Sequence, residues 1–288
     1  MTKEEDGVNS STRALSRKNR VFVFRDFLLE TYGEYLDKNS TILDVAGGKG
    51  DLSWLLVNVD RIDSVVVDPR VTKQIHLTRS VEYLRQHPEE TQRRSIPHLP
   101  TYQPLATLLP KFENIQKFSK PRHLRLLLDQ DLVNAVSEYL ASESWESWKL
   151  FWSRASEKAL ERQTLGYEES ADCSVNQVND AVVALNTILQ TRLIVGFHPD
   201  QATEACVDLA SLLSIPFCIV PCCVFPSEFP QRENQDGTRV RTYQQLIEYL
   251  SRKCEGVRRA DLNFPFTETA KNRVLFTLPG DTNKRNKR

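Results

Sequence analysis

Residues 41–52 read T-I-L-D-V-A-G-G-K-G-D-L, and this stretch predicts the fold of the chain around it. An apolar run at residues 42–45 is followed by three closely spaced glycines, Gly47, Gly48 and Gly50. From Asp51 onward leucines recur at the spacing of one helical face. A strand, a tight glycine turn and a helix open a nucleotide-binding α/β unit, because glycine allows both the sharp turn and a close ligand.

A second apolar run, at residues 64–67, ends in Asp68-Pro69-Arg70. An acidic residue at the end of the second strand accepts hydrogen bonds from ribose hydroxyls in dinucleotide folds. The glycine turn and Asp68 together therefore predict a cofactor site. The alternative is a glycine turn that only packs a helix on the sheet.

Spacing separates two cofactor classes. The nearest match to the dinucleotide pattern G-x-G-x-x-G begins at Gly48 and has Ser53 in the last place, which disfavours an NAD-dependent oxidoreductase. The run D-V-A-G-G-K-G instead resembles motif I of class I S-adenosylmethionine-dependent methyltransferases, D/E-x-G-x-G-x-G. Asp44, Gly48 and Gly50 fit that pattern, and Ala46 replaces its first glycine.

Bulk composition is that of a globular protein. Of the 288 residues, 40% are hydrophobic and 26% are charged, which disfavours disorder or a fibrous class. The 38 basic and 38 acidic residues give a net charge of zero, which argues against a broad electrostatic surface for nucleic acid but leaves room for a local basic patch.

The sequence also predicts the compartment and the domain limits. No run approaches the roughly 20 apolar residues of a membrane span, and the acidic N-terminus does not look like a secretory signal. Six cysteines without a disulfide-like pattern favour a cytoplasmic or nuclear protein. We expect a disordered segment at 1–14, a methyltransferase-like domain at 15–280 and a basic tail at 281–288, with the oligomeric state left open.

Regular α/β alternation continues after a long interruption. We expect a packing helix at 20–36. Trp145, Trp148 and Trp152 form a stripe that we expect in the core, and the alternative is a base-stacking surface. Residues 123–128 are either the third strand or the start of a helix, inside a helical insertion at about 71–190. The later elements are predicted as helices at 178–189, 203–213 and 240–253 and strands at 193–195, 216–220, 261–264 and 273–278.

This order resembles the α/β, Rossmann-like, seven-stranded sheet of class I methyltransferases, which is mostly parallel with an antiparallel strand at the edge. The segments D-V-A-G-G-K-G, V-V-D-P-R, G-F-H-P-D-Q-A-T-E and V-P-C-C-V-F-P resemble those of a eukaryotic methyltransferase-like group. That group is distantly similar to the branch of the tRNA 2′-O-methyltransferase with a cysteine/histidine-rich (CCHC-type) domain. The resemblance implies S-adenosylmethionine as the cofactor and RNA (tRNA or rRNA) as the first substrate class to test.

The resemblance also assigns roles to residues at the carboxyl ends of the strands. The three glycines would approach the methionine part of the cofactor, Asp44 would orient their loop, and Asp68 would hold the ribose. His198 would remove a proton from the methyl acceptor, because an ordinary histidine pKa of about 6.5 suits a base. Asp200 would orient His198 or bind substrate; alternatively it caps the helix that follows.

Cys222 and its neighbour Cys223 admit three interpretations. Buried, inert packing is the commonest fate of a free cysteine. A nucleophile, as in RNA cytosine-5 methyltransferases, is the second, and Cys222 is the candidate. A zinc site is disfavoured, because zinc needs about four ligands and the other cysteines show no C-x-x-C pair.

The expected function is thus methyl transfer from S-adenosylmethionine, with small molecules or proteins open as acceptors besides RNA. A catalytically inactive methyltransferase-fold module that binds RNA or protein is the alternative from a different class. It predicts weak cofactor affinity and tolerance of His198→Ala.

Overall fold

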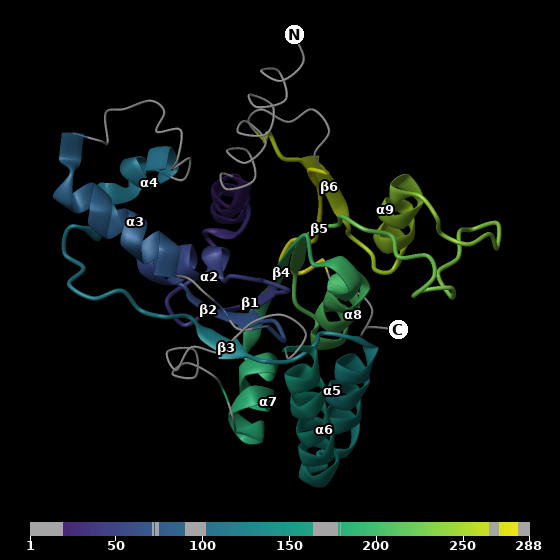
Figure 1. Cartoon of the computed structure of the whole chain (residues 1–288). Helices are drawn as coiled ribbons and strands as arrows, with labels where there is room; N and C mark the ends of the chain where they lie inside the picture. Colours follow the sequence, from purple (N-terminus) through teal and green to yellow (C-terminus); the bar gives the residue numbers. More distant parts are fainter. Residues whose placement is uncertain are drawn as a thin grey trace.

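The computed structural model of the chain describes residues 20–70, 72, 75–89, 102–163, 178, 180–264 and 271–281. Figure 1 shows these residues as helices packed around one central sheet. The predicted disordered segment at 1–14 and residues 282–288 of the basic tail lie outside the described residues.

The sheet has seven strands in the order β3-β2-β1-β4-β5-β7-β6. All the pairings from β3 to β5 are parallel, whereas β7 runs antiparallel to both β5 and β6. A seven-stranded, mostly parallel α/β sheet with antiparallel pairing at one edge is therefore confirmed. The strands are β1 (Thr41–Val45), β2 (Asp63–Val67), β3 (Arg122–Leu124), β4 (Thr191–Phe197), β5 (Phe217–Val220), β6 (Arg258–Asp261) and β7 (Arg273–Phe276).

Central strands form where the sequence is continuously apolar. Every residue of β1 and β5 is buried, because parallel strands are covered by helices on both faces. Leu43 in β1 pairs with Val65 in β2 on one side and with Ile194 in β4 on the other. The glycine turn after β1 thus leaves the middle of the sheet.

The antiparallel end differs in detail from the prediction. The antiparallel strand is β7, which lies between β5 and the edge strand β6. Residues 261–264 were expected as a strand, but β6 begins at Arg258, and most of its residues are exposed. Its polar sequence, R-R-A-D, carries no apolar signal because edge strands need none.

Two layers of helices cover the sheet. Because side chains alternate along a strand, Leu43 and Ile194 face one layer and Ile42 and Leu193 face the other. Figure 1 shows α5, α6 and α7 together beyond one face, with α3 and α4 on the opposite side. The helices are residues 20–32, α2 (Asp51–Leu55), η1 (Leu56–Asp60), α3 (Ile75–Gln86), α4 (Tyr102–Leu108), η3 (Leu109–Phe112), α5 (Gln130–Ser142), α6 (Trp145–Gln163), α7 (Ala181–Leu189), η5 (Asp200–Ala202), α8 (Thr203–Leu213) and α9 (Tyr243–Arg252).

The tryptophan stripe belongs to the core. Trp148 is 1% exposed and donates its indole N–H to the carbonyl of Ala181 at 2.6 Å, which ties α6 to α7. Trp145 and Trp152 pack against the same hydrophobic cluster. The predicted core role is therefore confirmed.

The range at 71–190, predicted as an insertion, contains β3 as well as helices. Helices α3 and α4 precede this strand, and α5, α6 and α7 follow it. Among the helices that the structure describes, none combines the length and the apolar character that crossing a membrane requires.

Candidate functional site

The turn after β1 has three residues in the left-handed region of backbone space. Gly48 has φ 57° and Gly50 has φ 77°, values at which glycine avoids the steric cost of a Cβ. Ala46 has φ 52°, so alanine occupies a strained conformation where motif I has glycine. The cost of this replacement is therefore conformational.

Asp44 lies directly beneath this turn and is 1% exposed. Its Oδ2 accepts a hydrogen bond from the hydroxyl of Ser53 at 2.8 Å, and that hydroxyl also contacts Ser64 Oγ at 2.9 Å. A Cβ on Gly47 would lie 2.7 Å from Asp44 Oδ2, so a larger residue there requires the carboxyl group or the turn to shift. Burial raises the pKa of Asp44 to about 7, against the hydrogen bonds from Ser53, which lower it.

Asp68 follows β2, and its carboxylate connects the loop after β2 with the glycine turn after β1. Its side chain is fully buried, and its Oδ2 accepts the backbone N–H of Gly48 at 2.9 Å. The side chain of Arg70 lies along the same carboxylate, with Nε 3.0 Å from Oδ1 and Nη2 2.9 Å from Oδ2. The backbone of Asp68 is held by β3, through Leu124 and His123.

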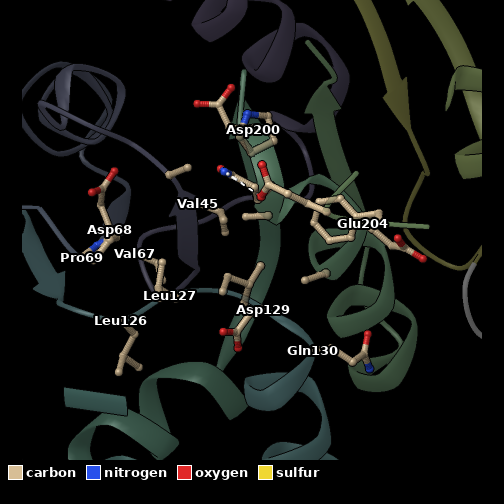
Figure 2. Close-up of a pocket in the computed structure, with 18 of the residues that line it drawn as sticks. Val45, Val67, Asp68, Pro69, Leu126, Leu127, Asp129, Gln130, Asp200 and Glu204 are labelled. Atoms are coloured by element: carbon tan, nitrogen blue, oxygen red, sulfur yellow. Dashed lines mark hydrogen bonds between the residues drawn. The ribbon is translucent and has the colours of Figure 1, made fainter. Parts of the chain in front are cut away.

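A cleft of about 540 Å³ opens at the carboxyl ends of β1, β2 and β4 and beside the segment after β3. Of the predicted site residues, Asp68 and Asp200 line it, together with Ala46. Figure 2 shows Asp68, Asp129 and Asp200 on different sides of this cleft, with Glu204 on a further wall. Carboxyl ends of parallel strands are where open α/β sheets bind ligands.

Acidic side chains dominate the polar lining. Asp129 begins α5 as its N-cap and pairs with Lys158 at 2.9 Å. Asp129 lines the cleft. Glu204 accepts Nε of the buried Arg232 at 2.7 Å. Lys158 and Arg232 offset the charge of these two carboxylates, so the wall offers oxygen acceptors that suit a hydroxyl-rich ligand.

His198 lies at the end of β4 with φ 58° and outside the lining of this cleft. Burial, with smaller contributions from the charges of Arg20 and Lys271, lowers its pKa to about 4. The ordinary pKa on which its role as a base was predicted therefore does not hold. Both ring nitrogens are buried and make no hydrogen bond within the described part of the chain.

Asp200 and Cys222 are brought together by the loops after β4 and β5. The Cys222 thiol donates a hydrogen bond to Asp200 Oδ1 at 3.0 Å. Burial and this hydrogen bond raise the pKa of the thiol, which opposes the thiolate that a nucleophile requires. Asp200 therefore uses its carboxylate on Cys222, and α8 begins without a side-chain cap, contrary to the capping alternative.

The structure adds contacts that the sequence patterns did not reveal. Cys222, Cys223 and Asp200 have possible ligand atoms within 4.8 Å of one another, one fewer than the four of a structural zinc site. Arg70 stands in the quoted run V-V-D-P-R, and its two-residue spacing from Asp68 was the available signal. The pairing of Arg232 with Glu204 joins segments 28 residues apart and left no local signal.

Comparison of the chain with protein-family models, with curated proteins and with solved structures gives no match. Function is therefore inferred from the side chains themselves. They provide a glycine turn over the buried Asp44, the Asp68 carboxylate at the end of β2, and a cleft that Asp68 lines.

Proposed function

We propose that the chain is an S-adenosylmethionine-dependent methyltransferase and that RNA is the first acceptor class to test. One observation carries the proposal: the glycine turn and Asp68 meet at the point where the strand order reverses. In the order β3-β2-β1-β4-β5 that point lies between β1 and β4, beside the 540 Å³ cleft. This volume is within the range of small-molecule sites, about 300–1,000 Å³.

The residues present fit the cofactor. Asp68 provides two carboxylate oxygens of the kind that ribose hydroxyls need, and the turn at Gly48 and Gly50 brings backbone close to a ligand. The carboxylate oxygens that line the cleft suit the hydroxyl and amino groups of this cofactor. When bound, S-adenosylmethionine supplies an electrophilic methyl group, and the contribution of the chain is to hold and align the two reactants.

Two features favour this cofactor over NAD. Ser53 is fully buried and hydrogen-bonded to Asp44, so a side chain fills the place where the third glycine of a dinucleotide fold lets helix and strand pack closely. In addition, the antiparallel β7 lies beside β5, whereas the dinucleotide order has the sixth strand there. Both features agree with the methyltransferase resemblance.

On the acceptor side the chemistry is one of positioning. His198 is neutral near pH 7 because its pKa is lowered to about 4, but its ring lies outside the cleft lining, so it is not the group that meets an acceptor there. Asp200 is exposed at the cleft and supplies a carboxylate. Cys222, as a neutral thiol donor to Asp200, fits a supporting role better than a nucleophilic one.

Transfer of a radiolabelled methyl group tests this proposal. The full chain is incubated with labelled S-adenosylmethionine and, separately, tRNA, rRNA and a protein extract. We expect label in an RNA fraction, and at least about a tenfold lower rate for Asp200→Asn, which removes the cleft carboxylate. Asp236→Asn, in the exposed loop after β5, is the matched control. Absence of label from every acceptor class would contradict the proposal.

A catalytically inactive module is the second candidate, and a specific observation favours it. The carboxylate of Asp68 is fully engaged by Gly48 and Arg70, and Ala46 strains the turn. Both features weaken a cofactor site. This candidate predicts that no methyl transfer occurs and that His198→Ala leaves binding of an RNA or protein partner unchanged.

A further inference from the structure

We propose that Arg70 covers the ribose-binding carboxylate, so that a ribose-containing cofactor binds only after it displaces the Arg70 guanidinium. This inference rests on the proposed function, because it takes Asp68 as the ribose partner. It adds a residue that sets cofactor affinity, and that residue lies two positions beyond Asp68 in the chain.

The carboxylate of Asp68 is completely occupied. Oδ1 accepts the backbone N–H of Arg70 at 2.8 Å and its Nε at 3.0 Å. Oδ2 accepts the backbone N–H of Gly48 at 2.9 Å and Arg70 Nη2 at 2.9 Å. A carboxylate has about four lone-pair sites, and these four donors use them. Two ribose hydroxyls therefore have to replace two existing donors.

The donors that give way are those of the Arg70 side chain. The two backbone N–H groups belong to the turn and to the strand end, and losing them would disrupt both loops. The Arg70 side chain is 58% exposed, whereas that of Asp68 is fully buried. Water can accept the released guanidinium, so its departure is the less costly exchange.

The position of Arg70 also lets its guanidinium cover the Asp68 carboxylate. Its Nη2 lies 3.7 Å from where a Cβ of Gly48 would be, so the guanidinium lies between the glycine turn and the end of β2. Both Asp68 and Arg70 line the cleft. A ribose that approaches Asp68 from the cleft meets the guanidinium first.

The size of the effect follows from the pair that must break. Hydrogen bonds to charged groups are stronger than neutral ones, whereas exposed ion pairs contribute little, so this half-exposed bidentate pair is expected to weaken binding about tenfold. Removing the guanidinium should therefore tighten the binding of a ribose-containing ligand by that factor.

The test is calorimetric titration of the full chain with S-adenosylhomocysteine, which has no net charge. Arg70→Gln removes the charge and the bidentate geometry and should bind about tenfold more tightly than the unmodified chain. Arg70→Lys keeps the charge but loses the fork, should fall between the two, and serves if the glutamine variant folds poorly. Lys38→Gln removes an exposed charge outside the cleft and should leave the affinity unchanged.

A second pair of ligands identifies the ribose as the competitor. Arg70→Gln should gain affinity for adenosine but not for 2′,3′-dideoxyadenosine, which lacks both hydroxyls. Equal gains for the two nucleosides would overturn the inference, because the guanidinium would then act elsewhere. Equal affinities of Arg70→Gln and the unmodified chain for S-adenosylhomocysteine would also overturn it, while the proposed function stands. Failure of every variant to bind would overturn the proposed function and the inference together.

Discussion

Asp44 should make the protein less stable as pH rises, and Asp44→Asn should remove that dependence. Burial raises the pKa of this carboxyl group from 3.8 to about 7. Between these values the folded chain retains a proton that the unfolded chain has released. Stability from this group is therefore fully present below pH 3.8 and is lost as pH rises through about 7.

The magnitude follows from the two pKa values. The difference between 3.8 and about 7, at about 1.4 kcal/mol for each pH unit, gives about 4 kcal/mol over the whole window. From about pH 5 to about pH 8 the same relation gives a loss of about 2–3 kcal/mol in the free energy of unfolding. The asparagine side chain has no charge at any pH, so the variant lacks this loss.

Urea unfolding of both proteins at about pH 5 and about pH 8 measures the effect. We expect the variant to gain about 2–3 kcal/mol on the unmodified chain between the two conditions. Asp131→Asn, which removes a carboxylate from a side chain that is 73% exposed, should keep the profile of the unmodified chain. A constant difference between Asp44→Asn and the unmodified chain would refute the reasoning.

Three further predictions concern the turn and the buried ion pair. Gly47→Ala places a Cβ 2.7 Å from Asp44 Oδ2 and should lower stability by about 1–3 kcal/mol in urea unfolding; an unchanged midpoint would show that the turn adapts. Ala46→Gly relieves the strain of φ 52° and should tighten cofactor binding or raise stability by about 1 kcal/mol, measured by titration and thermal unfolding. A variant that gains neither affinity nor stability would show that Ala46 does not strain the turn. Arg232→Ala removes a buried guanidinium from Glu204, which keeps Lys253 and Tyr249, and should cost about 1–3 kcal/mol, seen as a lower thermal midpoint; an unchanged midpoint would mean that the pair contributes little.

The central strands were predictable because burial on both faces imposes a continuous apolar sequence. β1, β2, β4 and β5 meet this condition, and each lies where its apolar run was found. β3 has three residues, of which Arg122 and His123 are polar, so it could not be separated from a helix. β6 was misplaced because an exposed edge strand need not be apolar.

Site prediction succeeded where a role depends on the local backbone. Positive φ at Gly48 and Gly50 follows from the tight turn, and Asp68 follows from the end of β2. Contacts across loops were not predictable, since they depend on how separate segments meet. The hydrogen bond from Cys222 to Asp200 and the low pKa of His198 are of this kind.

Calorimetric titration with S-adenosylmethionine, and separately with NAD, tests the central claim most directly when it is repeated on Asp68→Asn. The variant keeps an acceptor for Gly48 but loses the charge that ribose hydroxyls recognise. We predict that S-adenosylmethionine binds, that NAD does not, and that the variant binds at least about tenfold more weakly. Absence of S-adenosylmethionine binding, or equal affinity in the variant, would contradict the cofactor site.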